Sequence, residues 1–353
     1  MCTPHVVFRA FGSSKMSAVS THPMEELAAS ANLCDRPESA FFPVDQPSRE
    51  VTLPISVIIP VKNEAQNLPR CLESLREAGE VYVIDSQSSD ETVELARSFG
   101  AQVIQFHYDG GWPKKRQWAL DVLPLHYDWV LLLDADESLT PELISEIKAA
   151  IRNPEVDGYH IGLEMFFLGR RLHHSGATFY KLSLFRRDKG RFECRTKRQD
   201  NSMCDMEVHE HVIVSGATQK LKHRLVHRNV DNLARYIHKH NDYSNWEARV
   251  WSTHSNEFNA IKPDLLGSQA QRRRWLRKKF FRLPGSSLLF FLYKYVVRFG
   301  FLDGVPGLIY CGFQGIQFFQ VKAKLYEAKL ALRRSKPIGA PEFTAMQDSH
   351  VRH

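Results

Sequence analysis

The sequence has 353 residues, of which 43% are apolar and 25% charged, a balance typical of a globular protein larger than one ordinary domain. This composition excludes a wholly disordered chain, a collagen and a coiled coil. The net charge of +7 is unevenly distributed, because residues 220–336 hold 23 Lys and Arg against 7 Asp and Glu. Such a basic, aromatic-rich segment predicts a polyanionic partner: an anionic lipid surface, a phosphosugar or a nucleic acid.

The first 53 residues differ in pattern from the rest of the chain. Residues 1–53 lack hydrophobic periodicity and are rich in Ser, Pro and small residues, which predicts a disordered leader. Apolar, β-branched runs then predict buried strands at 55–61, 81–85, 101–106 and 129–133.

Helix patterns separate these runs. Asn63 is placed to cap a helix over about 65–78, and Ser88 and Glu91 have the spacing of a capping box. Thr140 is placed to cap a later helix that has proline in its first turn. Strands alternating with helices predict an α/β fold with a doubly wound, mostly parallel sheet. Ligands of such sheets bind at the carboxyl ends of the strands.

Four parts of the chain come after the leader. Residues 54–150 are predicted to form the ligand-binding half of a domain, and 151–228, with short strands and turns, its second half. Residues 229–336 are predicted to form a basic helical region, and 337–353 a disordered tail.

The helical region contains long apolar stretches. The stretch 283–301 contains Lys294 and Arg298, and 304–321 is uncharged but interrupted by glycine, proline and glutamine, so neither is a clean membrane span. Basic residues between 272 and 282 flank these stretches, which favours helices lying in one leaflet of an anionic membrane. Buried core helices and true spanning helices are the alternatives. No recognised nucleic-acid motif accompanies the charge, so we expect no nucleic-acid partner.

Carboxylates follow the fourth predicted strand. Asp134 and Asp136 emerge at its end, where burying charge is costly unless a cation compensates. Carboxylate oxygens suit Mg²⁺ or Mn²⁺, which readily bridge the phosphates of a nucleotide. The alternative is a solvated turn in which the aspartates cap a helix.

The other strand ends are also polar. Asp85 ends the second run and can accept a hydrogen bond from a base N–H or a ribose hydroxyl, although turn chemistry is the alternative. No GxGxxG follows the first run, which argues against a dinucleotide oxidoreductase. The absence of GxxxxGK[ST] argues against P-loop phosphoryl transfer.

Four motifs in fixed order carry a resemblance: PVKNE, VIDSQSSDET, GGWPKKRQWAL and LLLDADE. The series resembles family-2 glycosyltransferases of the GT-A fold, particularly bacterial enzymes of lipopolysaccharide core and exopolysaccharide assembly, including the β-1,4-glucosyltransferase type. The resemblance covers about residues 55–230 and implies that 54–228 form a GT-A glycosyltransferase domain, with 54–150 as its nucleotide-sugar half and 151–228 as its acceptor half. It implies an inverting transfer from a nucleotide-diphospho-sugar, usually UDP-linked, with a divalent cation.

The resemblance also assigns residues. Glu64 and Asp85 match positions that line the base and ribose, and Asp134 and Asp136 match the diphosphate and metal motif. Ser86 stands where many members have a second acidic residue.

A basic helix start is the next matching element. Lys114, Lys115 and Arg116 match a position near the nucleotide, where positive charge suits a diphosphate. A solvated helix start is the alternative.

An inverting transfer needs a base for the acceptor hydroxyl. Glu210 lies in a Val-His-Glu element like that of the look-alikes and is the predicted base, with Glu207 as the second candidate. His209 and His211 alternate with Glu210, and either is a candidate for contacting the diphosphate or metal, or for a packed or exposed histidine.

The string Gln-Arg-Arg-Arg-Trp at 271–275 fits the QxxRW pattern of processive family members. Those enzymes carry several clear spans, so a basic, membrane-facing helix is the preferred interpretation.

The resemblance, together with the basic helical region, therefore implies transfer of glucose or a close relative from a UDP-sugar to a glycolipid or lipid-linked glycan, at the cytoplasmic face of the inner membrane. Two other classes of function remain open. One is a catalytically silent, membrane-associated nucleotide-sugar-binding scaffold, and the other is a GT-A-like nucleotidyltransferase.

Overall fold

The computed structural model describes residues 52–177, 179–195, 205–207, 210–228, 232–252, 261–267, 269–281 and 283–334. The predicted disordered leader, apart from its last two residues, and the predicted disordered tail lie outside the described residues. All described residues fall in one compact unit. The division between 228 and 229 stays a prediction.

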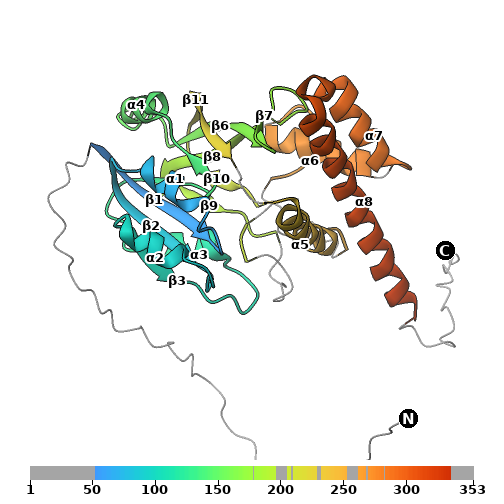
Figure 1. Cartoon of the computed structure of the whole chain (residues 1–353), viewed down its shortest axis with the longest axis horizontal. Helices are drawn as coiled ribbons and strands as arrows, with labels where there is room; N and C mark the ends of the chain where they lie inside the picture. Colours follow the sequence, from blue (N-terminus) through green and yellow to red (C-terminus); the bar gives the residue numbers. More distant parts are fainter. Residues whose placement is uncertain are drawn as a thin grey trace, which may run out of the picture. The chain divides into compact units, whose positions relative to one another are not determined.

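The first half of the main sheet is parallel (Figure 1). Its neighbours, in sheet order, are β3 (Gln102–Gln105), β2 (Ala78–Asp85), β1 (Leu53–Val61) and β4 (Trp129–Leu132). The connecting helices are α1 (Leu68–Glu73), α2 (Thr92–Ser98) and α3 (Lys115–Val122). The order reverses between β1 and β4, the kind of position at which open α/β sheets bind ligands.

The second half of the sheet is mixed. It continues with β8 (Tyr180–Arg186), β6 (Gly158–Phe167), β11 (Thr218–Arg228) and β5 (Glu137–Ser138). Only β6 and β11 pair in parallel here, since β8 is antiparallel to both β4 and β6, and β5 is antiparallel to β11. The prediction of a mostly parallel sheet therefore holds for the first four strands only.

The second half of the sheet is mixed because of the connection between β6 and β8. Its described residues form turns and the short strand β7 (Arg170–Arg171), which pairs with β6, with no crossover helix. A chain without a crossover returns antiparallel. A separate ribbon pairs β9 (Gly190–Phe192) with β10 (Val212–Val214).

Both faces of the first strands are buried. Val57 and Ile59 of β1 belong to one hydrophobic cluster and Ile58 to another, on the opposite face of the strand. This explains why the predicted strands read as continuous apolar runs rather than as alternating ones.

The predicted helix caps have different outcomes. Thr140 caps α4 (Pro141–Ala150) by accepting from Leu143 N at 3.2 Å, as predicted. The cap predicted for Asn63 is wrong, because its side-chain oxygen accepts from Ser89 N at 2.8 Å and α1 begins only at Leu68.

The capping box predicted for the second helix is also wrong. Ser88 Oγ donates to Asp85, and α2 has Glu91 at its N-cap without a side-chain cap bond. The polar groups of these loops bind each other across the strand ends, so they are not available to the helices.

The C-terminal region is helical, as predicted. Its elements are α5 (Leu233–Ser252), α6 (Gln269–Phe281), α7 (Ser286–Leu292), the short π-helix η2 (Tyr293–Val297), the short 3₁₀-helix η3 (Gly300–Asp303) and α8 (Gly304–Arg334). Helix α8 packs against α5 and α7 (Figure 1). Tyr310 and Cys311 of α8 join Phe167 of β6 in a third hydrophobic cluster, which attaches the helices to the sheet.

No helix within the described part of the chain is both long and apolar enough to cross a bilayer.

Candidate active site

A cavity of about 1860 Å³ lies at the carboxyl ends of the central strands and extends to α5. Of the predicted site residues, Glu64, Arg116, Asp134, Asp136 and Glu210 line it. Asp85 and Lys114 are not among the described residues that line it. The fold therefore brings most of the predicted residues to one place.

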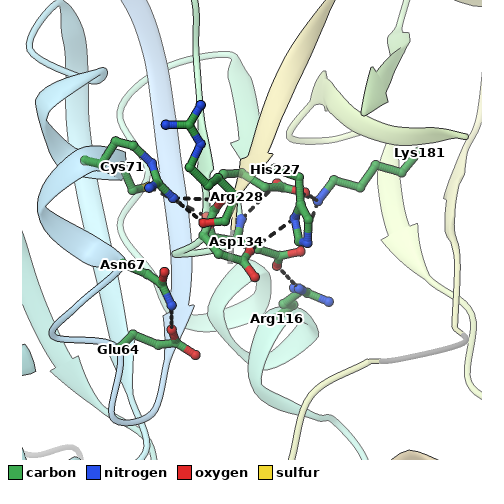
Figure 2. Close-up of polar contacts among 11 residues, drawn as sticks. Glu64, Asn67, Cys71, Arg116, Asp134, Lys181, His227 and Arg228 are labelled. Carbon is green, nitrogen blue, oxygen red and sulfur yellow. Dashed lines mark hydrogen bonds and ion pairs between the residues drawn. The ribbon is translucent and has the colours of Figure 1, made fainter. Parts of the chain in front are cut away.

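Asp134 lies at the centre of an ion-pair cluster just beyond β4 (Figure 2). It pairs with Arg116 from α3 and with Lys181 Nζ from β8, the latter at 3.1 Å. Burial raises the pKa of Asp134, but the two cations outweigh this and hold the pKa well below its usual range. Asp134 is therefore ionised at neutral pH and already has protein partners.

Glu137 and Lys181 extend the cluster. Lys181 Nζ donates to both carboxylate oxygens of Glu137 at 2.7 Å, and Glu137 accepts from Asp134 N at 3.1 Å. The Glu137 side chain is fully buried, and its ion pair with Lys181 offsets part of the cost of burying the carboxylate.

Asp136 faces His227, a residue of β11 that the sequence analysis did not single out. His227 Nδ1 lies 3.3 Å from Asp136 Oδ1, and β11 pairs His227 with Glu137. Burial lowers the pKa of His227, but the carboxylates of Asp136 and Glu137 more than reverse this, so the net shift is upward. No local pattern marks His227, because only strand pairing brings it here.

The donor set around Asp136 fits a divalent cation. His227 Nδ1 is buried and has no hydrogen bond of good geometry within the described residues, although it lies 3.3 Å from Asp136 Oδ1 and 3.7 Å from Glu137 Oε1. A carboxylate oxygen and a neutral imidazole nitrogen are ligands that divalent cations accept, so a metal here would have to displace the proton that the two carboxylates favour on His227. Within the described residues, no group of three or more His, Cys, Asp or Glu side chains is arranged to hold a metal by itself.

The predicted base and its second candidate have very different surroundings. Glu207 accepts from Arg116 N at 3.1 Å and from Gln117 N at 2.9 Å, so it caps the start of α3. Neither carboxylate oxygen of Glu210 has a hydrogen-bond partner among the described residues. Burial raises the pKa of both carboxyl groups.

Lys114 lies beside Glu210 rather than on the cavity wall. Its Nζ is 3.5 Å from Glu210 Oε1, both side chains are fully buried, and the ammonium lies over the Trp246 ring of α5 at 4.9 Å. Lys114 lowers the pKa of Glu210 and offsets part of the effect of burial. Its predicted contact with the donor stays a prediction.

The next two residues of α3 do reach the cavity. Lys115 Nζ donates to Val61 O at 2.9 Å and pairs with Asp205 at 2.9 Å. Arg116 contacts Glu207 O at 2.8 Å as well as Asp134. The helix start thus joins the strand ends to the segment that carries Glu207 and Glu210.

Glu64 and Asp85 differ in whether they reach the cavity. Glu64 lines the cavity, accepts from Asn67 Nδ2 at 2.8 Å (Figure 2) and pairs with Arg235 of α5 at 3.1 Å. Asp85 is fully buried and accepts from Ser88 N at 3.0 Å and from Gln105 Nε2 at 2.9 Å. Asp85 therefore accepts hydrogen bonds from the turn that follows β2 and from β3, and its contact with the ribose stays a prediction.

Comparison with known proteins identifies the fold. Residues 56–212 match the model of the family described as Glycosyl transferase family 2. This part of the chain is a family 2 glycosyltransferase domain. The resemblance predicted from the motif series is confirmed, and the mixed sheet is a GT-A-like α/β glycosyltransferase fold.

Relatives align over most of the chain. It is 26% identical over 284 residues to the lipopolysaccharide core biosynthesis glycosyltransferase LpsC of Rhizobium meliloti, covering 78% of this chain and 93% of LpsC. It is 25% identical over 301 residues to the uncharacterized glycosyltransferase RC0292 of Rickettsia conorii, covering 84% and 97%. The crystal structure of S. aureus TarS 1-349 aligns over 79% of this chain and 92% of that chain, with 15% identity and a TM-score of 0.39.

Proposed function

We propose that this glycosyltransferase moves glucose or a closely related sugar, with inversion, from a UDP-sugar to a glycolipid or lipid-linked glycan in lipopolysaccharide or exopolysaccharide biosynthesis. The name of LpsC, which refers to lipopolysaccharide core biosynthesis, supports this class of acceptor. The cavity, at about 1860 Å³, exceeds the roughly 300–1,000 Å³ of a site for one small ligand. That volume supports binding of donor and acceptor together.

The donor diphosphate is proposed to bind at the Asp134–Asp136 turn. Asp136 and His227 would hold Mg²⁺ or Mn²⁺ there, and the ion would neutralise charge on the leaving diphosphate. Arg116 and Lys181 add positive charge at the same place, with Asp134 fixing their positions. Glu64 is proposed to contact the nucleoside.

Glu210 is proposed to act as the general base. It takes the proton of the acceptor hydroxyl while that oxygen bonds to the anomeric carbon. The bond from this carbon to the diphosphate oxygen breaks, and UDP leaves from the opposite face, which inverts the configuration. The observation that carries this role is a buried, cavity-lining carboxylate without a hydrogen bond to any described residue and with a raised pKa.

Attachment to the cytoplasmic face of the inner membrane is part of the proposal. The surface of α7, η2, η3 and the start of α8 exposes apolar side chains, among them Leu288, Val296, Val297, Phe299, Leu302 and Val305. We call these six residues the apolar face. Exposed lysines of α6, Lys278 and Lys279, belong to the same helical region, which supports an anionic lipid surface as the partner.

The test begins with a screen of UDP-sugars and glycolipid acceptors by product detection, followed by Glu210→Gln. This substitution keeps the size of the side chain but cannot take the proton, so turnover should fall by about 10²–10⁴-fold. UDP affinity should stay within about twofold, because the base acts on the acceptor.

Glu207→Gln is the matched comparison. It weakens the cap of α3 and should lower thermal stability more than turnover per folded molecule. Near-normal turnover of Glu210→Gln together with loss in Glu207→Gln would move the base to Glu207.

A further inference from the structure

The QxxRW string contributes one side chain that the proposed reaction does not use. Arg274 of α6 donates from Nη1 to Glu193 Oε2 at 3.0 Å and pairs through Nη2 with Glu193 Oε1. It also donates to Ile261 O at 2.9 Å. The Glu193 side chain is fully buried and that of Arg274 is 12% exposed. A buried, two-pronged ion pair of this kind fixes both partners in place.

Glu193 is in turn bonded to the residue that comes directly after the base. Glu193 N donates to His211 O at 3.0 Å, and His211 N donates back to Glu193 Oε1 at 3.1 Å. The first bond continues the backbone ladder of β9 and β10, in which Phe192 pairs with Val212, and the second runs from the His211 backbone to the Glu193 carboxylate. A continuous path therefore runs from Arg274 through Glu193 and His211 to the backbone of Glu210.

Within the described residues, the side chain of Glu210 has no hydrogen-bonded restraint of this kind. Its carboxylate makes no hydrogen bond to a described residue, and Lys114 approaches only to 3.5 Å. The position of the carboxylate consequently depends on the backbone that Glu193 holds. Arg274 is not among the described residues that line the cavity, whereas Arg272 of the same helix is.

We propose that Arg274 is a positioning residue, which holds Glu193 so that the Glu193–His211 ladder aims Glu210 at the acceptor hydroxyl. This inference rests on the proposed role of Glu210 as the base. It assigns the arginine of the QxxRW string to the base rather than to the donor or to a lipid surface.

The expected effect of Arg274→Ala is a selective loss of turnover. A displacement of about 1 Å at a reacting group lowers the rate by about 10²-fold, so kcat should fall by that order. The Kd for UDP, measured by calorimetry, should change by less than about twofold. Arg274→Lys keeps the charge but not the two-pronged geometry and should restore part of the lost kcat.

A double-mutant cycle separates positioning from general stabilisation. In the Glu210→Gln background there is no base to aim, so Arg274→Ala should lower turnover by less than about threefold further. A merely structural role would give the full additional loss, measured per folded molecule. If Arg274→Ala does not fold, the double variant Arg274→Gln/Glu193→Gln replaces the buried charges with a neutral amide pair, and the same cycle applies.

Arg277→Ala is the matched control. Arg277 lies one turn along the same helix and pairs with Glu247 of α5 at 2.6 Å, so its loss also breaks an ion pair with a buried carboxylate. Its described partners are Glu247 and the Phe318 ring rather than the Glu193–His211 ladder, so kcat should stay within about twofold of wild type.

Three results would overturn the inference. Additive losses with Glu210→Gln would show that Arg274 acts independently of the base. A tenfold weaker UDP affinity at unchanged kcat would place Arg274 at the donor. Normal turnover of Glu210→Gln would remove both the proposed base and its positioning residue, whereas the first two results leave the base intact.

Discussion

Charged residues are usually exposed and apolar residues usually buried. The cavity wall at the ends of the strands (the strand-end wall) departs from this rule by burying charge, and the C-terminal helices depart from it by exposing apolar side chains. The wall buries charge: Lys115, Asp136, Glu137 and Glu210 are almost completely inaccessible to solvent. The helices expose apolar side chains, with Val297 61% and Val305 68% accessible. Buried charge and exposed apolar surface are the two deviations that carry functional information.

The comparison supports the proposal that the two regions have different kinds of partner. Buried carboxylates and cations in a cavity provide fixed electrostatics for a small, charged ligand, at a cost in stability that folding alone does not require. The six side chains of the apolar face are each more than half exposed, and the partner proposed for them is an extended one such as a bilayer surface. The most informative experiments change residues in one region and measure both turnover and vesicle binding. The property proposed for the unchanged region then serves as the control.

The largest effect is expected at the strand-end wall. Asp136→Ala removes the carboxylate proposed to hold the metal, and several kcal/mol of charge stabilisation correspond to a loss of turnover of at least about 10³-fold. Asp134→Ala releases Arg116 and Lys181 and should be nearly as severe. Product formation with and without added Mn²⁺ measures both, and vesicle binding should not change. Full activity in excess chelator would contradict the metal assignment.

A smaller effect is expected at the apolar face. Val297→Asp with Val305→Asp should weaken binding to anionic vesicles by about tenfold or more, because each buried valine contributes about 1.5 kcal/mol or more. Sedimentation with vesicles at rising salt measures this, and UDP affinity should remain normal. Val122→Asp, at a site 51% exposed at the end of α3, is the matched control and should bind vesicles like the wild type. Equal binding of all three proteins would remove the interfacial interpretation.

The smallest effect is expected where the two regions meet. Lys114 lowers the pKa of Glu210, so Lys114→Met should raise it. A base works in its deprotonated form, so the acid limb of the kcat profile should move to higher pH. Turnover on the acid limb would then fall by more than turnover on the alkaline plateau. An unmoved limb with a higher KM for the donor would instead support the predicted contact of Lys114 with the diphosphate.

Local sequence patterns were sufficient for the parallel half of the fold and for part of the site. Strand β1 is buried on both faces, so its sequence is a continuous apolar run that predicts a strand without reference to any partner. The carboxylates Asp134 and Asp136 follow such a run directly, so their place at the sheet edge was predictable. Thr140 is similar, because its cap bond reaches only three residues along the chain.

The antiparallel half of the sheet and the surroundings of each charged group were decided by tertiary structure alone. His227 and Lys181 reach the aspartates only through the pairing of β11 and β8, and no local pattern marks either residue. Glu207 and Glu210 are both candidates for the base in the sequence, yet the start of α3 binds Glu207 and leaves Glu210 without a described hydrogen bond. The sequence likewise does not distinguish Arg274 from the two arginines before it, and only the fold places it beside Glu193. A residue's type and neighbours fix its local structure, but its pKa and its partners depend on which distant groups share its buried volume.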